Sequence, residues 1–349
     1  MPDPVLSVRD LSVEFHTAGG VVHAVDHVSY EVRPGETLAV VGESGCGKTV
    51  TSLAVLGLVP QPPGRIVSGE ILFEGEDLLR ASPRALRRLR GSEISMIFQD
   101  PQSSLNPVFT IGQQIAGVLR AHDRRLSAKA ARARTVELLT GVGIPDASER
   151  LADYPHQWSG GMCQRAMIAM AMANQPKVLI ADEPTTALDV TIQAQVLDVL
   201  RQAQRETGAA TVLITHDLAV VAEMADRVAV MYAGRIVETG GVHAIFHAPR
   251  HPYTLGLMAS LPRLHTDLRQ LEPIPGQPPT LVRVPPGCPF HPRCRLRRGR
   301  DRCVAEVPPL LDVPGSVQHA SACHFWPEMP DEVDTVSERI GVDLGAGLR

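Results

Sequence analysis

The alternation of apolar and polar residues near the start of the chain predicts two strands, over residues 6–15 and 21–32, joined by a turn. Residues 64–74 have the pattern of a further pair of strands, closed by a turn at Gly75. Three continuous runs of aliphatic or β-branched residues have the length of buried parallel strands: 37–41, 178–181 and 211–215.

Helical spacing dominates the middle of the chain, from residue 83 to residue 206, with breaks at 99–107, 141–145 and 154–161. A helix is also expected from Lys48 to about residue 58. Small residues and methionines over 163–174 indicate a helix buried on most sides. Strands that alternate with helices in this way predict an α/β fold with a parallel sheet.

The character of the chain changes after about residue 245. Proline, arginine and cysteine are frequent over residues 249–330, and three Pro-Pro pairs keep the predicted segments short. We expect a small appended domain with little regular structure, stabilised by something other than a large apolar core. Residues 331–349 are expected to form a flexible tail.

Composition narrows the class of protein. The 349 residues are enough for two domains, and the net charge of -4 provides no general basic field to hold nucleic acid. No apolar run approaches the ~18 residues of a membrane span, and the N-terminus lacks the pattern of a signal peptide. A cytoplasmic protein is therefore expected, and any membrane-spanning part would come from another subunit.

A glycine-rich segment lies between the strand at 37–41 and the helix that starts at Lys48. It fits the pattern G-x-x-x-x-G-K-[ST] without a mismatch: Gly42, Glu43, Ser44, Gly45, Cys46, Gly47, Lys48 and Thr49. Such a loop surrounds the phosphates of a nucleotide with backbone N–H groups at a helix N-terminus. Lys48 is expected to neutralise phosphate charge, and Thr49 to offer its hydroxyl to Mg²⁺.

Two carboxylates end the apolar run at 178–181. Asp182 stands where a carboxylate can hold Mg²⁺ through water, and Glu183 follows it directly. A carboxylate in the second position can orient or deprotonate the water that attacks the γ-phosphate. The pair therefore predicts hydrolysis at the nucleotide site.

With these motifs in this order, the chain resembles the ATP-binding subunits of ABC transporters over about residues 5–240. The resemblance implies that Gln99 belongs to the loop that touches Mg²⁺ or the attacking water, and that His216 contacts the γ-phosphate. Phe15 is the candidate for stacking on adenine, with His16 as its nearest competitor and a place in the core as the alternative for its ring. ATP and Mg²⁺ are the implied cofactors.

The same resemblance identifies a signature motif and a dimer. The matching residues are Ser159, Gly160, Gly161, Met162, Gln164 and Asp189. In the family this motif reaches the γ-phosphate held by a second ATPase subunit, so that two ATP molecules lie between two chains. Trp158 and Cys163 depart from the residues that are usual in the motif.

Further motifs resemble the dipeptide and oligopeptide (peptide/nickel) importer branch of the family: residues 98–107, 154–157, 251–254, 274–279 and 287–294. The implied fold has a parallel-sheet core, an antiparallel β subdomain and a helical subdomain at about 100–175, all within residues 1–245. A C-terminal extension follows over 246–330. The implied partners are a second ATPase chain of different sequence, two transmembrane permeases and an extracytoplasmic substrate-binding protein, at the cytoplasmic face of the membrane.

Four cysteines gather in the extension with the spacing C-x5-C-x8-C-x19-C: Cys288, Cys294, Cys303 and Cys323. In a reducing compartment such a group favours a metal site over disulfides. Some members of the family carry a [4Fe–4S] cluster on such a quartet. Zn²⁺, with His291 or His324 as a substitute ligand, and no metal at all are the alternatives.

Three other functions compete with peptide import. Nickel or glutathione import is an alternative within the same branch. A nucleic-acid-linked ABC ATPase is disfavoured, because the interval between Lys48 and Ser159 is short and the net charge is negative. A non-hydrolysing subunit is disfavoured by the presence of Glu183 and His216.

Overall fold

The computed structural model describes residues 2–186, 188–260 and 273–329, and the expected tail at 331–349 lies outside them. The chain forms two compact units that interleave along the sequence. Residues 1–6, 32–36 and 73–214 form one, named here the signature unit. The described residues of 7–31, 37–72, 215–260 and 273–329 form the other, named the phosphate-loop unit.

A mixed sheet forms the centre of the phosphate-loop unit. β3 (Thr37–Val41) pairs in parallel with β9 (Arg227–Tyr232), and β9 pairs antiparallel with β10 (Arg235–Gly241). Two short strands, β12 (Ala320–Ser321) and β11 (Leu311–Asp312), extend it beyond β10. All five residues of β3 are buried, as its unbroken apolar run predicts.

Long antiparallel strands form a second layer of this unit. β1 (Leu6–Thr17) lies between β2 (Gly20–Val32) and β4 (Gly64–Phe73). The turn predicted at Gly75 is present and is followed by the two-residue strand β5 (Glu76–Asp77), but residues 64–73 form one strand where a pair was predicted. Gly69, at φ 105°, lets β4 pass within contact of the β1 backbone, where a Cβ would stand 2.6 Å from the Cα of Leu11.

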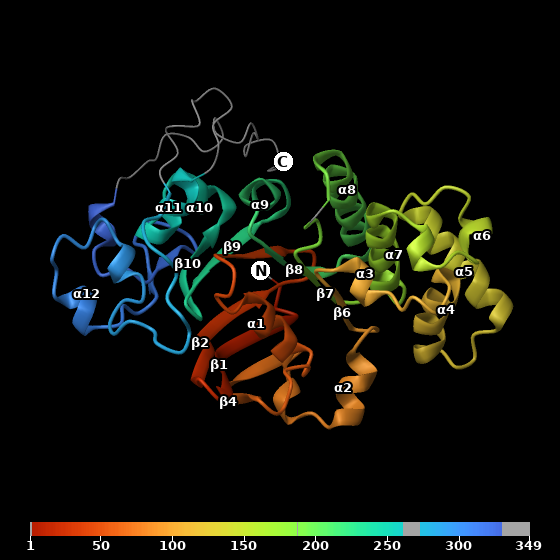
Figure 1. The fold of residues 1–349 in the computed structure, drawn as a ribbon, viewed down its shortest axis with the longest axis horizontal. Coiled ribbons are helices and arrows are strands. Elements are labelled where there is room, and N and C mark those ends of the chain that lie inside the picture. The colour runs from red at the N-terminus through yellow and green to blue at the C-terminus, as the bar shows by residue number, and fades with distance from the viewer. Residues whose placement is uncertain (1, 187, 261–272, 330–349) are drawn as a thin grey trace. The chain divides into compact units, whose positions relative to one another are not determined.

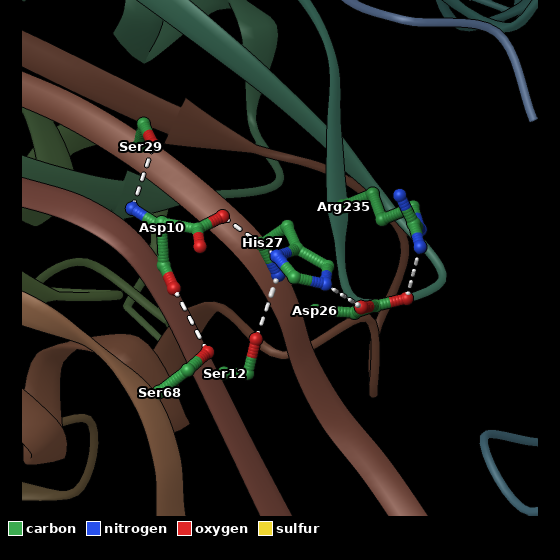
Figure 2. Close-up of polar contacts among 7 residues, drawn as sticks. All are labelled: Asp10, Ser12, Asp26, His27, Ser29, Ser68 and Arg235. Atoms are coloured by element: carbon green, nitrogen blue, oxygen red, sulfur yellow. Dashed lines mark hydrogen bonds and ion pairs between the residues drawn. The ribbon is translucent and has the colours of Figure 1, made fainter.

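Serine side chains replace ladder hydrogen bonds where β1 and β2 become irregular (Figure 2). Asp10 and His27 have positive φ angles of 51° and 54°. The N–H of Asp10 donates to Ser29 Oγ at 2.8 Å, and that of His27 donates to Ser12 Oγ at 3.1 Å. His27 Nδ1 also lies 2.6 Å from Asp10 Oδ1. The serine hydroxyls therefore satisfy the two backbone N–H groups locally.

Three parallel strands form the sheet of the signature unit. β7 (Val178–Asp182) pairs with β6 (Ile94–Ile97) on one side and with β8 (Ala210–Thr215) on the other. The sequence pattern predicted β7 and β8 but assigned β6 to a helical region. β6 has only four residues and follows the arginine-rich helix α2 (Pro83–Leu89), so its period is too short to recognise.

Helices make up most of the rest of this unit (Figure 1). They are α3 (Pro101–Ser104), α4 (Ile111–His122), α5 (Ala128–Gly141), α6 (Ala147–Arg150), α7 (Gly160–Met172) and α8 (Val190–Thr207). α7 packs against α3, α4, α5, α8 and β6, which agrees with its predicted burial on most sides. It begins at Gly160, three residues before its predicted start.

Residues of the C-terminal extension pack into the core of the phosphate-loop unit. The phosphate-loop unit also contains α1 (Lys48–Val55), α9 (Leu218–Met224), α10 (Val242–His247), α11 (Pro252–Ala259) and α12 (Arg302–Ala305). Tyr253 and Met258 of α11 and Phe290 pack into one core with Tyr232 and Phe246. The expectation of an extension without a large core is wrong, because its aromatic residues share the core of the sheet.

A buried carboxylate joins the extension to β10. Glu238 is 0% exposed and accepts hydrogen bonds from the backbone N–H groups of Arg250 and His251. His319 Nε2 lies 2.8 Å from the same carboxylate. These contacts satisfy both oxygens, which a buried carboxylate needs.

No helix within the described ranges 2–186, 188–260 and 273–329 is long and apolar enough to cross a membrane.

The buried imidazole of His251 makes stability depend on pH. Its Nδ1 accepts the N–H of Tyr253 at the start of α11, and burial lowers its pKa to about 3. Since the unfolded chain binds a proton near pH 6.5, stability is present above that pH and lost as the pH falls toward 3, by about 1.4 kcal/mol per pH unit. His251→Asn keeps a capping oxygen and removes the titration. Urea unfolding of both proteins should show a steeper loss for the parent between pH 6.5 and 4.5, and equal slopes would contradict this assignment.

The contact between α7 and α8 depends on a glycine. A Cβ at Gly161 would lie 2.5 Å from Cγ2 of Ile192, a β-branched side chain with little freedom to move. We expect Gly161→Ala to lower the free energy of unfolding by about 1–3 kcal/mol. Gly141→Ala, where a Cβ meets nothing within 4 Å, is the matched control and should gain about 0.5–1 kcal/mol. Equal stabilities of the two variants in chemical denaturation would show that Ile192 does not restrict the site.

Candidate functional site

The phosphate loop connects β3 to α1, and its glycines are required by neighbouring backbone. Gly42 and Gly47 have φ angles of 156° and 108°. A Cβ on either would lie 2.1 Å from a carbonyl oxygen, that of Met231 for Gly42 and that of Ala24 for Gly47. Only glycine allows the loop to lie this close to β9 and β2.

Lys48 closes this loop from within. Its side chain is buried, and Nζ donates to the carbonyl oxygens of Gly42 at 2.8 Å and Glu43 at 3.1 Å. Cys46 Sγ lies 3.9 Å from the same nitrogen, and burial raises the pKa of that thiol. The ammonium group is therefore held over the inside of the loop, as a residue that neutralises phosphate charge must be.

The other predicted ATP contacts of this unit lie at strand ends. Phe15 is half-buried near the end of β1, with its ring close to Gly64, while His16 is exposed. His216 follows β8 and is exposed. Asp217 then caps α9 by accepting the N–H of Ala219 at 2.9 Å. His216 is thus placed between the end of a buried strand and the start of a helix.

In the signature unit the structure brings Gln99 and Glu183 together. Gln99 Nε2 donates to Glu183 Oε2 at 2.8 Å, and Thr186 Oγ1 donates to the same oxygen at 2.8 Å. Glu183 has a φ of 49°, and its N–H donates to the carbonyl of Ile214. Asp182, at the end of β7, is 2% exposed. Two donors thus fix one carboxylate oxygen of Glu183, which a group that orients water needs.

Thr186 was not predicted from the sequence. It lies three residues after Glu183, and Thr186 N also donates to the carbonyl of Glu183, which closes a turn. A threonine three residues after an acidic strand end is the only sequence signal for this contact, and it is a weak one.

The signature motif forms the start of α7. Ser159 Oγ accepts the N–H of Met162 at 3.3 Å, and the serine itself remains exposed. Gln164 is 2% exposed within the helix bundle. Asp189 caps α8 by accepting the N–H of Ile192 at 3.0 Å. An exposed serine at a helix N-terminus is a site that favours anions.

Both departures from the usual signature are directed inward. Cys163 is 2% exposed, its thiol donates to the carbonyl of Pro155 at 3.5 Å, and burial raises its pKa. Trp158 is 7% exposed, and its indole N–H donates to Asp153 at 3.1 Å. These side chains therefore pack in the interior beneath the motif, and the residues that the motif exposes to solvent are unchanged.

All four cysteines of the extension line one cavity of about 20 Å³, together with aromatic rings, histidines and Arg297. Burial raises the pKa of Cys288 to about 11 and that of Cys323 to about 12, and repulsion between neighbouring thiolate charges adds to both shifts. Arg300 opposes this effect at Cys294 and Cys303. Four soft sulfur donors with nearby cations fit a thiolate-bound metal centre in their chemistry.

The geometry for a single metal ion is absent from the residues that the structure describes. Among them, no three histidine, cysteine or acidic side chains are arranged to hold one ion. His291 Nδ1 lies 2.9 Å from the carbonyl of Cys288, and His324 Nε2 lies 3.1 Å from that of Glu306. Each of these contacts uses one ring nitrogen and leaves the other available, and both histidines line the same cavity as the four thiols.

Two regions of the chain match known protein families. Residues 25–186 match the family model described as ABC transporter, and residues 237–303 match the oligopeptide/dipeptide transporter C-terminal region. The dipeptide transport ATP-binding protein DppD of Bacillus subtilis is 54% identical over 295 residues, which cover 84% of this chain and 88% of that protein. DppD of Escherichia coli is 50% identical over 321 residues, covering 92% and 96%.

Solved structures resemble the fold. CbiO1 of Clostridium perfringens, part of the ABC transporter complex cbiONQ, is 28% identical with a TM-score of 0.59, covering 70% of this chain and 91% of that one. The dimeric ABC transporter cassette MJ0796 is 24% identical with a TM-score of 0.61, covering 68% and 98%. The predicted α/β fold of the ABC type is confirmed. The chain belongs to the family of dipeptide and oligopeptide ABC-transporter ATP-binding proteins.

Proposed function

We propose that this protein is the ATP-hydrolysing subunit of a membrane importer of dipeptides or oligopeptides. The observation that carries this proposal is the match to peptide-transport ATP-binding proteins along 84% or more of the chain, including the C-terminal region. Its partners would be a second ATPase chain, two permeases and an extracytoplasmic binding protein, with the assembly at the cytoplasmic face of the membrane.

The proposed hydrolysis uses the residues that match the family motifs. Lys48 and the loop amides bind the phosphates, and Thr49, Gln99 and Asp182 hold Mg²⁺. Glu183 orients the attacking water, and its hydrogen bonds with Gln99 and Thr186 restrict the carboxylate to one position. His216 contacts the γ-phosphate, and Phe15 stacks on adenine. Ser159, Gly160 and Gly161 complete the site of the partner subunit through a helix N-terminus.

Reconstitution tests the transported substrate. The chain, two candidate permeases and a second ATPase are placed in liposomes with the binding protein, and ATP hydrolysis is measured with added dipeptides, oligopeptides, Ni²⁺ or glutathione. We expect stimulation by peptides. Stimulation by Ni²⁺ or glutathione alone would replace peptide as the substrate while leaving the ATPase assignment in place.

Removing the charge of Glu183 should separate ATP binding from hydrolysis. We expect Glu183→Gln to bind MgATP like the parent and to hydrolyse it at least about 100-fold more slowly, because the amide cannot accept a proton from water. Glu149→Gln, an exposed position on α6, is the control. Single-turnover hydrolysis at the parental rate by Glu183→Gln would show that another group activates the water.

A metal cluster on the extension is the second part of the proposal. The convergence of Cys288, Cys294, Cys303 and Cys323 on one cavity supports a [4Fe–4S] centre held by their thiolates, with a structural role. The arginines close to Cys294 and Cys303 would offset its negative charge. When bound, the cluster would cross-link three segments of the extension.

Purification without air tests this centre. The parent should be coloured and contain iron and acid-labile sulfide, and Cys294→Ser should lose both while still binding MgATP. Cys163→Ser, a buried thiol outside the cavity, is the control and should keep the colour. Colourless parent protein that contains zinc, or no metal, would refute the cluster.

A further inference from the structure

One arginine of the extension reaches the phosphate loop. Arg293 stands beside Cys294, and its guanidinium donates to both carboxylate oxygens of Glu43, at 2.6 and 2.9 Å. Arg293 Nε donates to the carbonyl of Pro275 at 2.9 Å, and Nη1 lies 3.3 Å from the hydroxyl of Tyr232. The fork geometry of this ion pair fixes the orientation of both side chains.

A second residue of the extension holds the same position of the loop. The hydroxyl of Tyr253, in α11, accepts the backbone N–H of Glu43 at 2.8 Å. Its ring is 0% exposed and packs on Tyr232 and Phe290, with centroids 4.6 and 5.4 Å away. Burial and the carboxylate of Glu43 raise the pKa of Tyr253, so the hydroxyl stays neutral. Residues of the extension therefore bind both the side chain and the backbone of Glu43.

The ion pair between Arg293 and Glu43 is strengthened because it is largely shielded from solvent. The side chain of Arg293 is 6% exposed and that of Glu43 is 25% exposed. Removing either partner would leave the other charge largely buried without compensation. A movement of Glu43 away from the extension would break this ion pair and the hydrogen bond with Tyr253.

The position of Glu43 affects the position of the Lys48 side chain. The carbonyl oxygen of Glu43 accepts a hydrogen bond from Lys48 Nζ at 3.1 Å, within the same short loop. A displacement of Glu43 would therefore change both the shape of the loop and the placement of Lys48 inside it.

We propose that Arg293 and Tyr253 are positioning residues for ATP binding, through which the C-terminal extension holds the phosphate loop in its phosphate-binding shape. This inference rests on the ATP site proposed above. It gives the extension a role in the nucleotide site itself, with a direct path from the residue next to Cys294 to the loop.

The test measures nucleotide affinity and stability separately on the full chain. MgATP binding is followed by titration calorimetry, and unfolding without nucleotide by circular dichroism, for the parent, Arg293→Gln, Tyr253→Phe and Glu43→Gln. Arg283→Gln, an exposed arginine of the extension, is the matched control. We expect MgATP to bind about tenfold more weakly to Arg293→Gln and a few-fold more weakly to Tyr253→Phe, with parental affinity in the control.

The double variant Arg293→Gln/Glu43→Gln distinguishes a shared contact from two separate effects. We expect its affinity to be close to that of Arg293→Gln, because the two residues act as one pair. Tyr253→Phe removes a single hydroxyl, so it provides the test if Arg293→Gln does not fold.

Two results would overturn the inference. Parental MgATP affinity in both Arg293→Gln and Tyr253→Phe, with or without a loss of stability, would reduce the contacts to a role in folding. Failure of the parent to bind MgATP would refute the proposed ATP site as well, so the two failures can be told apart.

Discussion

Close contact between the phosphate loop and the two β layers beside it is the constraint on which the rest of the phosphate-loop unit depends. The loop lies against the carbonyl of Met231 in β9 and that of Ala24 in β2, at distances that only glycine permits. The residue after Met231 is Tyr232, which begins the aromatic core shared with Tyr253 and Phe290. The same strand therefore bounds the nucleotide loop and supports the extension.

The sequence predicted those parts of the structure whose signals are local. The phosphate loop, β7, β8 and the helix after Ser159 each depend on residues within a few positions of one another. The hydrogen bond between Gln99 and Glu183 was not predicted, because no spacing within the chain indicates it. The domain boundaries and the roles of the site residues stay predictions.

Contacts between segments that are distant along the chain could not be recognised in the sequence. β6 is too short for its period to be recognised, and Gly69 marks a close approach of strands that no pattern in the sequence indicates. Arg293 and Glu43 are separated by 250 positions, and only the folded chain shows that they pair. Composition made the extension resemble a domain without a core, because its few aromatic residues pack against a sheet that lies outside it in sequence.

The interleaving of the two units has a consequence for synthesis. β3 precedes the phosphate loop, yet its partner β9 begins at Arg227, and the contact from Arg293 comes about 240 residues after Thr49. At about 5 to 20 residues per second, a ribosome needs roughly 12 to 50 seconds to cover that interval. For about three quarters of this time, until β9 has been made, the apolar strand β3 lacks its partner from the second half of the unit. The nascent strand is therefore exposed to aggregation until translation has passed β9, and the contact from Arg293 forms later still.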